Sequence, residues 1–463
     1  MIRLMYNEIV KLINKKSFYI VTFIFILFCV LTNVVYHTPF DNYETEIVDI
    51  KALEEENASL NLNSSEELLI YVENLTTIEI ERLKDEYSSN IQEYLIDHFL
   101  TSYIYQMYED EYILKNQELY MASLSELKNR ISYVQDGNWK YFLEERISYL
   151  ESRINETDGI EKIRYERLLE LANYRQEKNI PYDDNNYLHN SLDFLEENMV
   201  EYINLLNDDN LTNEEENRLE FLEEEMAIHE YVIENEQDIL NSHTLRAVLT
   251  NFSGEFGLFI LIYVIMVAGS IVSEEYQRGT IKNLLTKPFK RRTILSSKLL
   301  VVILFIPLIM LFMSLIEILI GGVILGFDSL FVPVVQYING GLETYSVLGY
   351  LFSLLFASLP IYFIVGIFAF MLSTVTASTS AAITISFLFY LLLNVISNLA
   401  VVYDFGVFKF FVSLYWDFSY LVTGASSPFN VSISNSVLVI LLYVLVMLCI
   451  AYVTFSKKDV KNI

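Results

Sequence analysis

The charged residues of segment 273–298 are the ones whose types and spacing could do chemistry in this sequence. The segment reads SEEYQRGTIKNLLTKPFKRRTILSSK and lies between two long apolar runs, Phe256–Val272 and Leu299–Leu325. Seven of its residues are Lys or Arg. Because a short basic loop between two membrane-crossing runs is held on the cytoplasmic side, we expect this loop to face the cytosol.

A short amphipathic helix is predicted inside this loop. Gly279 and Thr280 form its start, and Pro288 stops it. A helix that lies parallel to the membrane and faces the cytosol has the shape to receive a push from a soluble partner. On charge alone, a loop that only orients the neighbouring spans is an equally open interpretation. The apolar stripe of the helix consists of Ile281, Leu284 and Leu285.

Glu317 is the one ionisable residue well inside an apolar run. A carboxylate within a membrane span costs about 2.5–3.5 kcal/mol on insertion scales, and such residues usually have a function. We therefore expect Glu317 to line a transport path. The alternative is that it reaches water at the outer leaflet, since it lies nearer the outer end of its span.

Other motifs for catalysis or metal binding are absent from the sequence. It has no Gly-x-x-x-x-Gly-Lys-[Ser/Thr] phosphate loop, so the chain by itself is not an ordinary ATPase. It also has no His-Glu-x-x-His, and its five histidines show no ligand spacing, which predicts solvated surface residues and no metal site. Cys29 and Cys449 lie in apolar runs, so neither a disulfide framework nor a cysteine metal site is supported.

The elements that must position these residues are membrane spans and one acidic block. The chain has 463 residues, is 53% hydrophobic and has a mean hydropathy of +0.33, too apolar for an ordinary soluble protein. Residues 41–245 contain 50 acidic and 15 basic residues, a net charge of −35, whereas the remainder contains 10 acidic and 16 basic residues. An acidic polar block is therefore inserted into a mildly basic membrane protein.

Six spans are predicted, one before the acidic block and five after it. Residues 1–16 form a basic amphipathic helix expected to lie in the cytoplasmic interface, or simply the charged flank of a signal anchor. After residue 250, ten of eleven Lys and Arg residues fall on predicted inner segments, which places both termini in the cytoplasm. Pro307 is expected to kink the third span and Pro360 to interrupt the fourth, and 403–435 is an interfacial or re-entrant segment. The spans are Ser17–Tyr36 (within domain 17–38), Gly254–Val272, Leu299–Gly326, Ser346–Leu372, Ala381–Val402 and Ser436–Phe455 (all within 251–463).

The acidic block, residues 39–250, is predicted to be an extracytoplasmic helical domain because it lies between an outward and an inward span. Its apolar spacing is helical, and Asp136-Gly137 and Asp158-Gly159 indicate turns. Ser64-x-x-Glu67 and Thr212-x-x-Glu215 are capping boxes. We expect four to six helices in a short bundle of hairpins. The fold class is thus an all-α membrane protein with an outer helical domain.

The loop resembles a known family. Its order, Glu274-Glu275-x-x-x-Gly279-Thr280-Ile281-x-x-Leu284-Leu285-Thr286-x-Pro288 followed by Arg291-Arg292 and Lys298, is similar to the first cytoplasmic loop of permease subunits of ABC-2-type ABC transporters. The span layout extends the resemblance more loosely to residues 1–40 and 245–463. It implies an exporter subunit in the cytoplasmic membrane, partnered by a cytoplasmic ABC ATPase and by a second copy or a homologous permease. ATP and Mg would be held by the ATPase, with no cofactor on this chain and no nucleic-acid partner.

The resemblance also assigns roles to residues of the loop. It implies that Glu274, Glu275 and Arg278 help to fix the helix against the ATPase, and that ATP-driven closure presses on Ile281–Leu285. Ordinary solvated charge at a helix end is the alternative for each of the three. The charge of the acidic block would concentrate cations, which favours export of antimicrobial peptides or drugs, although acidic outer domains are often merely soluble.

Two other classes of protein are compatible with parts of this pattern. A non-pumping interaction protein, phage-receptor-like or secretion-accessory, shares this span layout. The Gly279-Thr280-Ile281 pattern favours the transporter, whereas a gene neighbourhood without an ATPase would favour the interaction protein. A membrane enzyme is disfavoured because the sequence has no paired catalytic constellation. The sequence does not identify the substrate.

Overall fold

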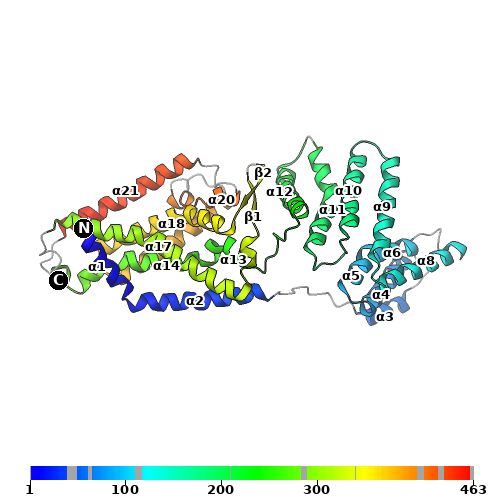
Figure 1. Cartoon of the computed structure of the whole chain (residues 1–463), viewed down its shortest axis with the longest axis horizontal. Helices are drawn as coiled ribbons and strands as arrows, with labels where there is room; N and C mark the ends of the chain where they lie inside the picture. The colour runs from blue at the N-terminus through cyan, green and yellow to red at the C-terminus, as the bar shows by residue number, and fades with distance from the viewer. Residues whose placement is uncertain are drawn as a thin grey trace. The chain divides into compact units, whose positions relative to one another are not determined.

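The computed structural model describes the chain as two compact helical units (Figure 1). The membrane unit comprises Met1–Phe40 and Asn241–Ile463, and the acidic unit comprises Asp41–Leu240. The residues described are 2–38, 49–60, 65–109, 117–208, 210–282, 289–338, 340–403, 411–425 and 432–458.

Six helices of the membrane unit are long and apolar enough to cross a bilayer, which confirms the prediction of an all-α protein with six spans. The third of them begins at Arg291, about two turns before the apolar run that predicted it, and this extension carries Lys298. The six are α2 (Lys16–His37), α14 (Phe252–Ser270), α17 (Arg291–Leu325), α18 (Val347–Thr376), α19 (Thr379–Tyr403) and α21 (Ile433–Lys457).

Helix α14 lies at the centre of the membrane unit. It packs against α17, α18 and α19, and side chains along most of its length are buried. Gly366 of α18 allows a close approach, since a Cβ there would lie 2.9 Å from Val264. By contrast, α2 and α21 keep large apolar side chains such as Leu27 and Leu441 exposed, as expected of surfaces that face lipid.

Proline does not divide the long helices. Pro307 lies inside the 35-residue helix α17 and Pro360 inside the 30-residue helix α18. The prediction that Pro360 interrupts the fourth span is therefore wrong. A proline within a membrane helix is tolerated when neighbouring helices and local adjustments satisfy the backbone groups that it frees.

The hairpin formed by β1 (Val334–Ile338) and β2 (Gly341–Tyr345) was not predicted; the sequence suggested only a loop. The strands pair antiparallel, with Val334 opposite Tyr345. The signal was present, because Asn339-Gly340 between two runs of β-forming residues is typical of a tight hairpin turn. Gly340 has the positive φ, 83°, that such a turn requires.

Residues 403–435, predicted to be re-entrant or interfacial, are described in part. Residues 411–425 form two short turns, η4 (Val412–Leu414) and α20 (Tyr420–Thr423), and Trp416 is buried in the core of the membrane unit. They contain no helix long enough to span. Their depth in a bilayer remains a prediction.

Residues 241–250 belong to the membrane unit rather than to the acidic domain, which the sequence analysis extended to residue 250. They include α13 (Leu245–Thr250), which packs against α17 and α18. Leu245, Val248 and Leu249 are fully buried there. The predicted end of the acidic domain, residue 250, lies beyond the observed one, Leu240, because α13 is too short to be recognised as a membrane span.

The acidic unit contains eight continuous helical runs in its described residues, more than the four to six predicted. Its core is aromatic and aliphatic and includes Phe142, Tyr182 and Leu192. The capping box of Thr212 and Glu215 is present, whereas Ser64 lies outside the described residues. The runs are α3 (Ile50–Ser59), α4 (Ser65–Glu86), α5–η1–α6 (Asn90–Leu95, Ile96–Leu100, Thr101–Glu109), α8 (Gln117–Gln135), α9 (Trp139–Glu156), α10 (Ile160–Lys178), α11 (Tyr187–Leu206) and α12 (Asn213–Asn235).

Candidate functional site

Arg291 and Lys458 lie together at one end of the membrane unit, which we name the basic end. The Arg291 guanidinium donates from Nη1 to the carbonyls of Ser456 and Lys458, both at 3.1 Å. The Lys458 ammonium donates in turn to the carbonyls of Thr374 and Val375, both at 3.0 Å. The start of α17 and the last turns of α18 and α21 are thereby joined.

Helix α1 (Ile2–Ile13) lies at the basic end and packs against α17 (Figure 1). The chain bends at Lys15, whose backbone is extended, before α2 begins. Glu8 and Leu12 of α1 are buried, whereas Tyr6 and Ile13 are exposed. The carboxylate of Glu8 is therefore turned into the protein, where it pairs with Lys298 of α17.

Four charged side chains form a closed ring of ion pairs, which we name the charge cluster. Its members are Glu8 and Lys11 of α1, Glu275 of α15 (Ser273–Gln277) and Lys298 of α17. Lys11 Nζ lies 3.4 Å from Glu8 Oε1 and 2.8 Å from Glu275 Oε1. Lys298 Nζ lies 3.0 Å from Glu8 Oε2 and 3.6 Å from Glu275 Oε1. Each charge thus has two partners of opposite sign.

Lys298 is 1% exposed, and its burial requires full compensation. Besides the two carboxylates, its ammonium donates to the carbonyl of Ile271 at 2.8 Å. Ile271 caps the C-terminus of α14, the end of a helix where a positive charge is stabilised. The Lys298 ammonium therefore has one backbone acceptor and two carboxylates of opposite charge around it.

Glu275 is 7% exposed and has a third contact, from the hydroxyl of Thr280 to Oε2 at 2.9 Å. Burial alone would raise the pKa of Glu275. The charge of Lys298 and hydrogen bonds from Lys11 and Thr280 outweigh burial and hold the pKa of Glu275 below its ordinary value. Burial lowers the pKa of Lys11, but its bond to Glu275 and the charges of both glutamates raise it overall. Both directions keep the pair ionised.

Glu274 makes a second set of contacts beside the charge cluster. Its Oε2 lies 2.5 Å from Lys15 Nζ, and its Oε1 lies 2.6 Å from Arg278 Nη2. Lys15 also donates to the hydroxyl of Ser270 at 2.9 Å. Glu274 thus pairs with Arg278 and Lys15, whereas Glu275 pairs with Lys11 and Lys298. Their contacts are with this chain itself, and a role toward a partner stays a prediction.

The segment that follows is described as far as Lys282. Gly279 has a φ of 67°, the left-handed conformation that ends α15, which favours glycine at this position. Ile281 is fully buried in the core of the membrane unit, so this member of the apolar stripe packs on its own chain. Leu284, Leu285 and Pro288 lie outside the described residues.

Glu317 is fully buried between α2 and α17, which rules out the predicted alternative that it reaches water in this structure. Asn33 Nδ2 donates to Glu317 Oε1 at 2.6 Å and to the carbonyl of Cys29 at 2.8 Å. Glu317 Oε2 and Asn33 Oδ1 have no hydrogen-bond partner among the described residues. This polar group joins two spans, and its role in a transport path stays a prediction.

Two histidines contradict the prediction that all five are solvated. His189 is 1% exposed and lies beside Arg175, with 3.0 Å between its Nδ1 and Arg175 Nη1. His229 is 8% exposed and stacks on Phe194. Burial lowers the pKa of each to about 4, so both are neutral at physiological pH. Apolar neighbours on distant segments bury these rings, which sequence spacing does not reveal.

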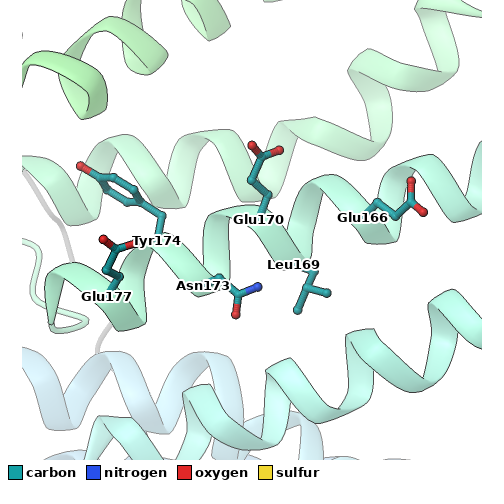
Figure 2. Close-up of a pocket in the computed structure, with 6 residues that line it drawn as sticks. All are labelled: Glu166, Leu169, Glu170, Asn173, Tyr174 and Glu177. Atoms are coloured by element: carbon teal, nitrogen blue, oxygen red, sulfur yellow. The ribbon is translucent and has the colours of Figure 1, made fainter.

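An acidic hollow of about 470 Å³ runs along α10 (Figure 2). Figure 2 shows the lining side chains along the helix, with carboxylates at Glu166, Glu170 and Glu177. Each of the six lining residues lies three or four residues from another of them, which places them on one face of the helix. No cationic side chain lines the hollow among the described residues, so it offers a diffuse negative surface.

These features define a multi-pass helical membrane protein whose amphipathic first helix, loop between the second and third spans, and third span are joined by the charge cluster. Residues 2–460 match the family described as ABC-2 family transporter protein, and the chain belongs to this family. It is therefore the membrane component of a transporter. The uncharacterized protein YhcI of Bacillus subtilis (strain 168) is 25% identical over 242 residues, which cover 52% of this chain and 76% of that protein. No solved structure matches the chain.

Proposed function

We propose that this chain is the permease subunit of an ABC-2-type exporter that moves its substrate across the cytoplasmic membrane with ATP hydrolysed by a separate subunit. Membership of the family supports this proposal, and the absence of a phosphate loop from the sequence is consistent with it. The observation that carries it is the charge cluster, which joins three elements at the start of the loop that would meet an ATPase.

The charge cluster gives this loop a mechanical connection to the spans. Glu275 precedes the segment that begins at Gly279, and its ion pairs lead to α1 through Lys11 and to α17 through Lys298. Pressure on residues 281–285 would therefore displace α1 and α17 together. In our proposal, closure of two ATPases, each holding ATP and Mg, rocks spans one to three and opens a path between two permease copies.

The orientation that we propose places the basic end in the cytoplasm and the acidic unit outside the cell. The Lys and Arg residues of the charge cluster and of the ends of α17 and α21 support it. Arg246 of α13 is an exception, since α13 lies near η2 (Asp328–Phe331) rather than at the basic end. We further propose that the acidic unit favours cationic substrates such as antimicrobial peptides or drugs, because its net charge of −35 attracts cations.

Reconstitution with a phosphate-loop ATPase encoded by an adjacent gene tests the proposal. The full chain and this ATPase would be purified together and placed in lipid nanodiscs, and ATP hydrolysis would be measured. We expect the wild-type chain to co-purify with the ATPase and to change its hydrolysis rate. Glu275→Gln should insert normally but lose much of this effect, because the neutral amide breaks the charge cluster.

Asp328→Asn is the matched control, since Asp328 is an exposed carboxylate outside the charge cluster. It should behave like the wild type. Introducing charge at Leu284 or Leu285 should prevent co-purification while leaving insertion intact. If Glu275→Gln changed hydrolysis no more than Asp328→Asn, the charge cluster would have no coupling role. If the wild-type chain bound no ATPase, a non-pumping interaction protein would be favoured.

A further inference from the structure

Three side chains of the acidic unit present metal-binding atoms to one another. His98, Asp193 and Glu197 each place a ligand atom within 4.8 Å of the other two. His98 comes from η1 and the two carboxylates from α11, almost a hundred residues later in the chain. No metal site was predicted from sequence, because these residues show no motif spacing.

Local helix geometry presents the three groups. Asp193 and Glu197 are four residues apart on α11 and so lie on one face of this helix. His98 lies in a π-helical turn, Ile96–Leu100, inside the run from Asn90 to Glu109. Such turns interrupt a regular α-helix and are frequent at functional sites.

Tyr94 supports two of the three groups. Its carbonyl lies 3.2 Å from His98 Nδ1, and a carbonyl only accepts, so this nitrogen carries the proton and Nε2 keeps a free lone pair. Its hydroxyl donates to Asp193 Oδ1. Hydrogen bonds of this kind orient metal ligands in proteins.

Access and donor type suit a transition-metal ion. His98 and Glu197 are exposed and Asp193 is half-buried, so an ion can enter and water can complete its coordination. One imidazole and two carboxylates match the nitrogen and oxygen ligands of Zn²⁺, whereas Ca²⁺ and Mg²⁺ prefer oxygen alone. We propose that His98, Asp193 and Glu197 form a Zn²⁺-binding site that links the η1 segment to α11.

The surrounding acidic surface does not account for the site. The face of α10 in Figure 2 carries three carboxylates without a histidine, and general attraction of cations would act there as well. Such attraction between exposed charges is screened by salt, over about 8 Å at physiological ionic strength. A site with direct ligand bonds keeps its ion under the same conditions.

The test uses the full chain, purified in detergent and stripped of metal. A calorimetric titration with Zn²⁺ at high salt should show one saturable site. His98→Ala should weaken binding by about 100-fold or more, since it removes a ligand, and Tyr94→Phe by about 10- to 100-fold, since it removes only the support. Zn²⁺ should also raise the thermal midpoint of the wild-type acidic unit but not that of His98→Ala.

Glu166→Gln is the matched control and should bind Zn²⁺ like the wild type, because Glu166 lies on α10. Co²⁺ in place of Zn²⁺ should show visible absorption of a nitrogen- and oxygen-ligated ion in the wild type and lose it in His98→Ala. Equal Zn²⁺ affinity in the wild type and His98→Ala, or binding that high salt abolishes in both, would overturn the proposal. Neither result bears on the role of an ATPase.

Discussion

Lys298 is the residue on which the charge cluster depends most. It is 1% exposed and is shared by Glu8 and Glu275. Lys298→Met leaves two buried carboxylates short of a cation, and breaking a buried pair costs about 3–5 kcal/mol. We expect the thermal midpoint of the membrane unit in detergent to fall clearly, whereas Lys290→Met, at an exposed position, should change stability by no more than about 0.5 kcal/mol.

The double variant separates pairing from packing. If Lys298 acts through its charge, adding Glu275→Gln to Lys298→Met should cost less than the sum of the two single changes, because one unpaired carboxylate is removed with its partner. Strict additivity of the two changes would show that Lys298 contributes only its volume.

Glu275 also gives the charge cluster a defined pH dependence. Because its pKa is lowered in the folded protein, its stabilisation is complete above the usual carboxyl pKa of about 4.3 and is lost as the pH falls through the lowered value. The pKa of Lys11 is raised, so its stabilisation is complete below about 10.4 and is lost above it. We expect the thermal midpoint of the membrane unit to change little between about pH 6 and 9. On acidification this midpoint should fall, and the fall should be smaller in Glu275→Gln than in the wild type. An equal acid response in both proteins would contradict this assignment.

At the scale of elements, the approach of α2 and α13 to α17 is fixed at Gly321. A Cβ on Gly321 would lie 2.6 Å from Leu245 Cδ1 and 2.7 Å from Asn33 Oδ1. Gly321→Ala should therefore lower the thermal midpoint. Gly254→Ala in α14 meets no atom within 4 Å and should raise stability, by up to about 1 kcal/mol, because alanine favours the helix. Similar effects of both changes would mean that this close approach is not maintained.

The spans were predictable from sequence because each depends on one continuous apolar run. Contacts between runs were not. Glu8 lies in the amphipathic first helix, and its partner Lys298 comes from a helix almost 300 residues later in the chain. Likewise, His98 gains its neighbours only when η1 meets α11. The sequence pointed to Glu274 and Glu275 as candidate site residues. It did not show that Glu275 is buried whereas Glu274 is partly exposed.

At the scale of the whole molecule, the order of elements along the chain means that the side of the membrane on which the basic end lies determines the side for the acidic unit. Helix α2 leads from the basic end to the opposite end of the membrane unit, and the acidic unit follows it in the chain. If the basic end is cytoplasmic, the acidic unit must therefore be outside. We expect a membrane-impermeant thiol reagent to label Glu166→Cys and Asp328→Cys in intact cells, and Lys290→Cys only after permeabilisation.

The native cysteines allow this measurement after simple replacement, since Cys29 is buried and Cys449 lies within a span. Lys290 and Asp328 are both exposed, so a difference in labelling reports the side of the membrane rather than burial. Labelling of Lys290→Cys in intact cells would show that the chain has the opposite orientation to the one proposed. The loop would then be out of reach of any cytoplasmic ATPase, and the charge cluster would have to serve a purpose other than coupling.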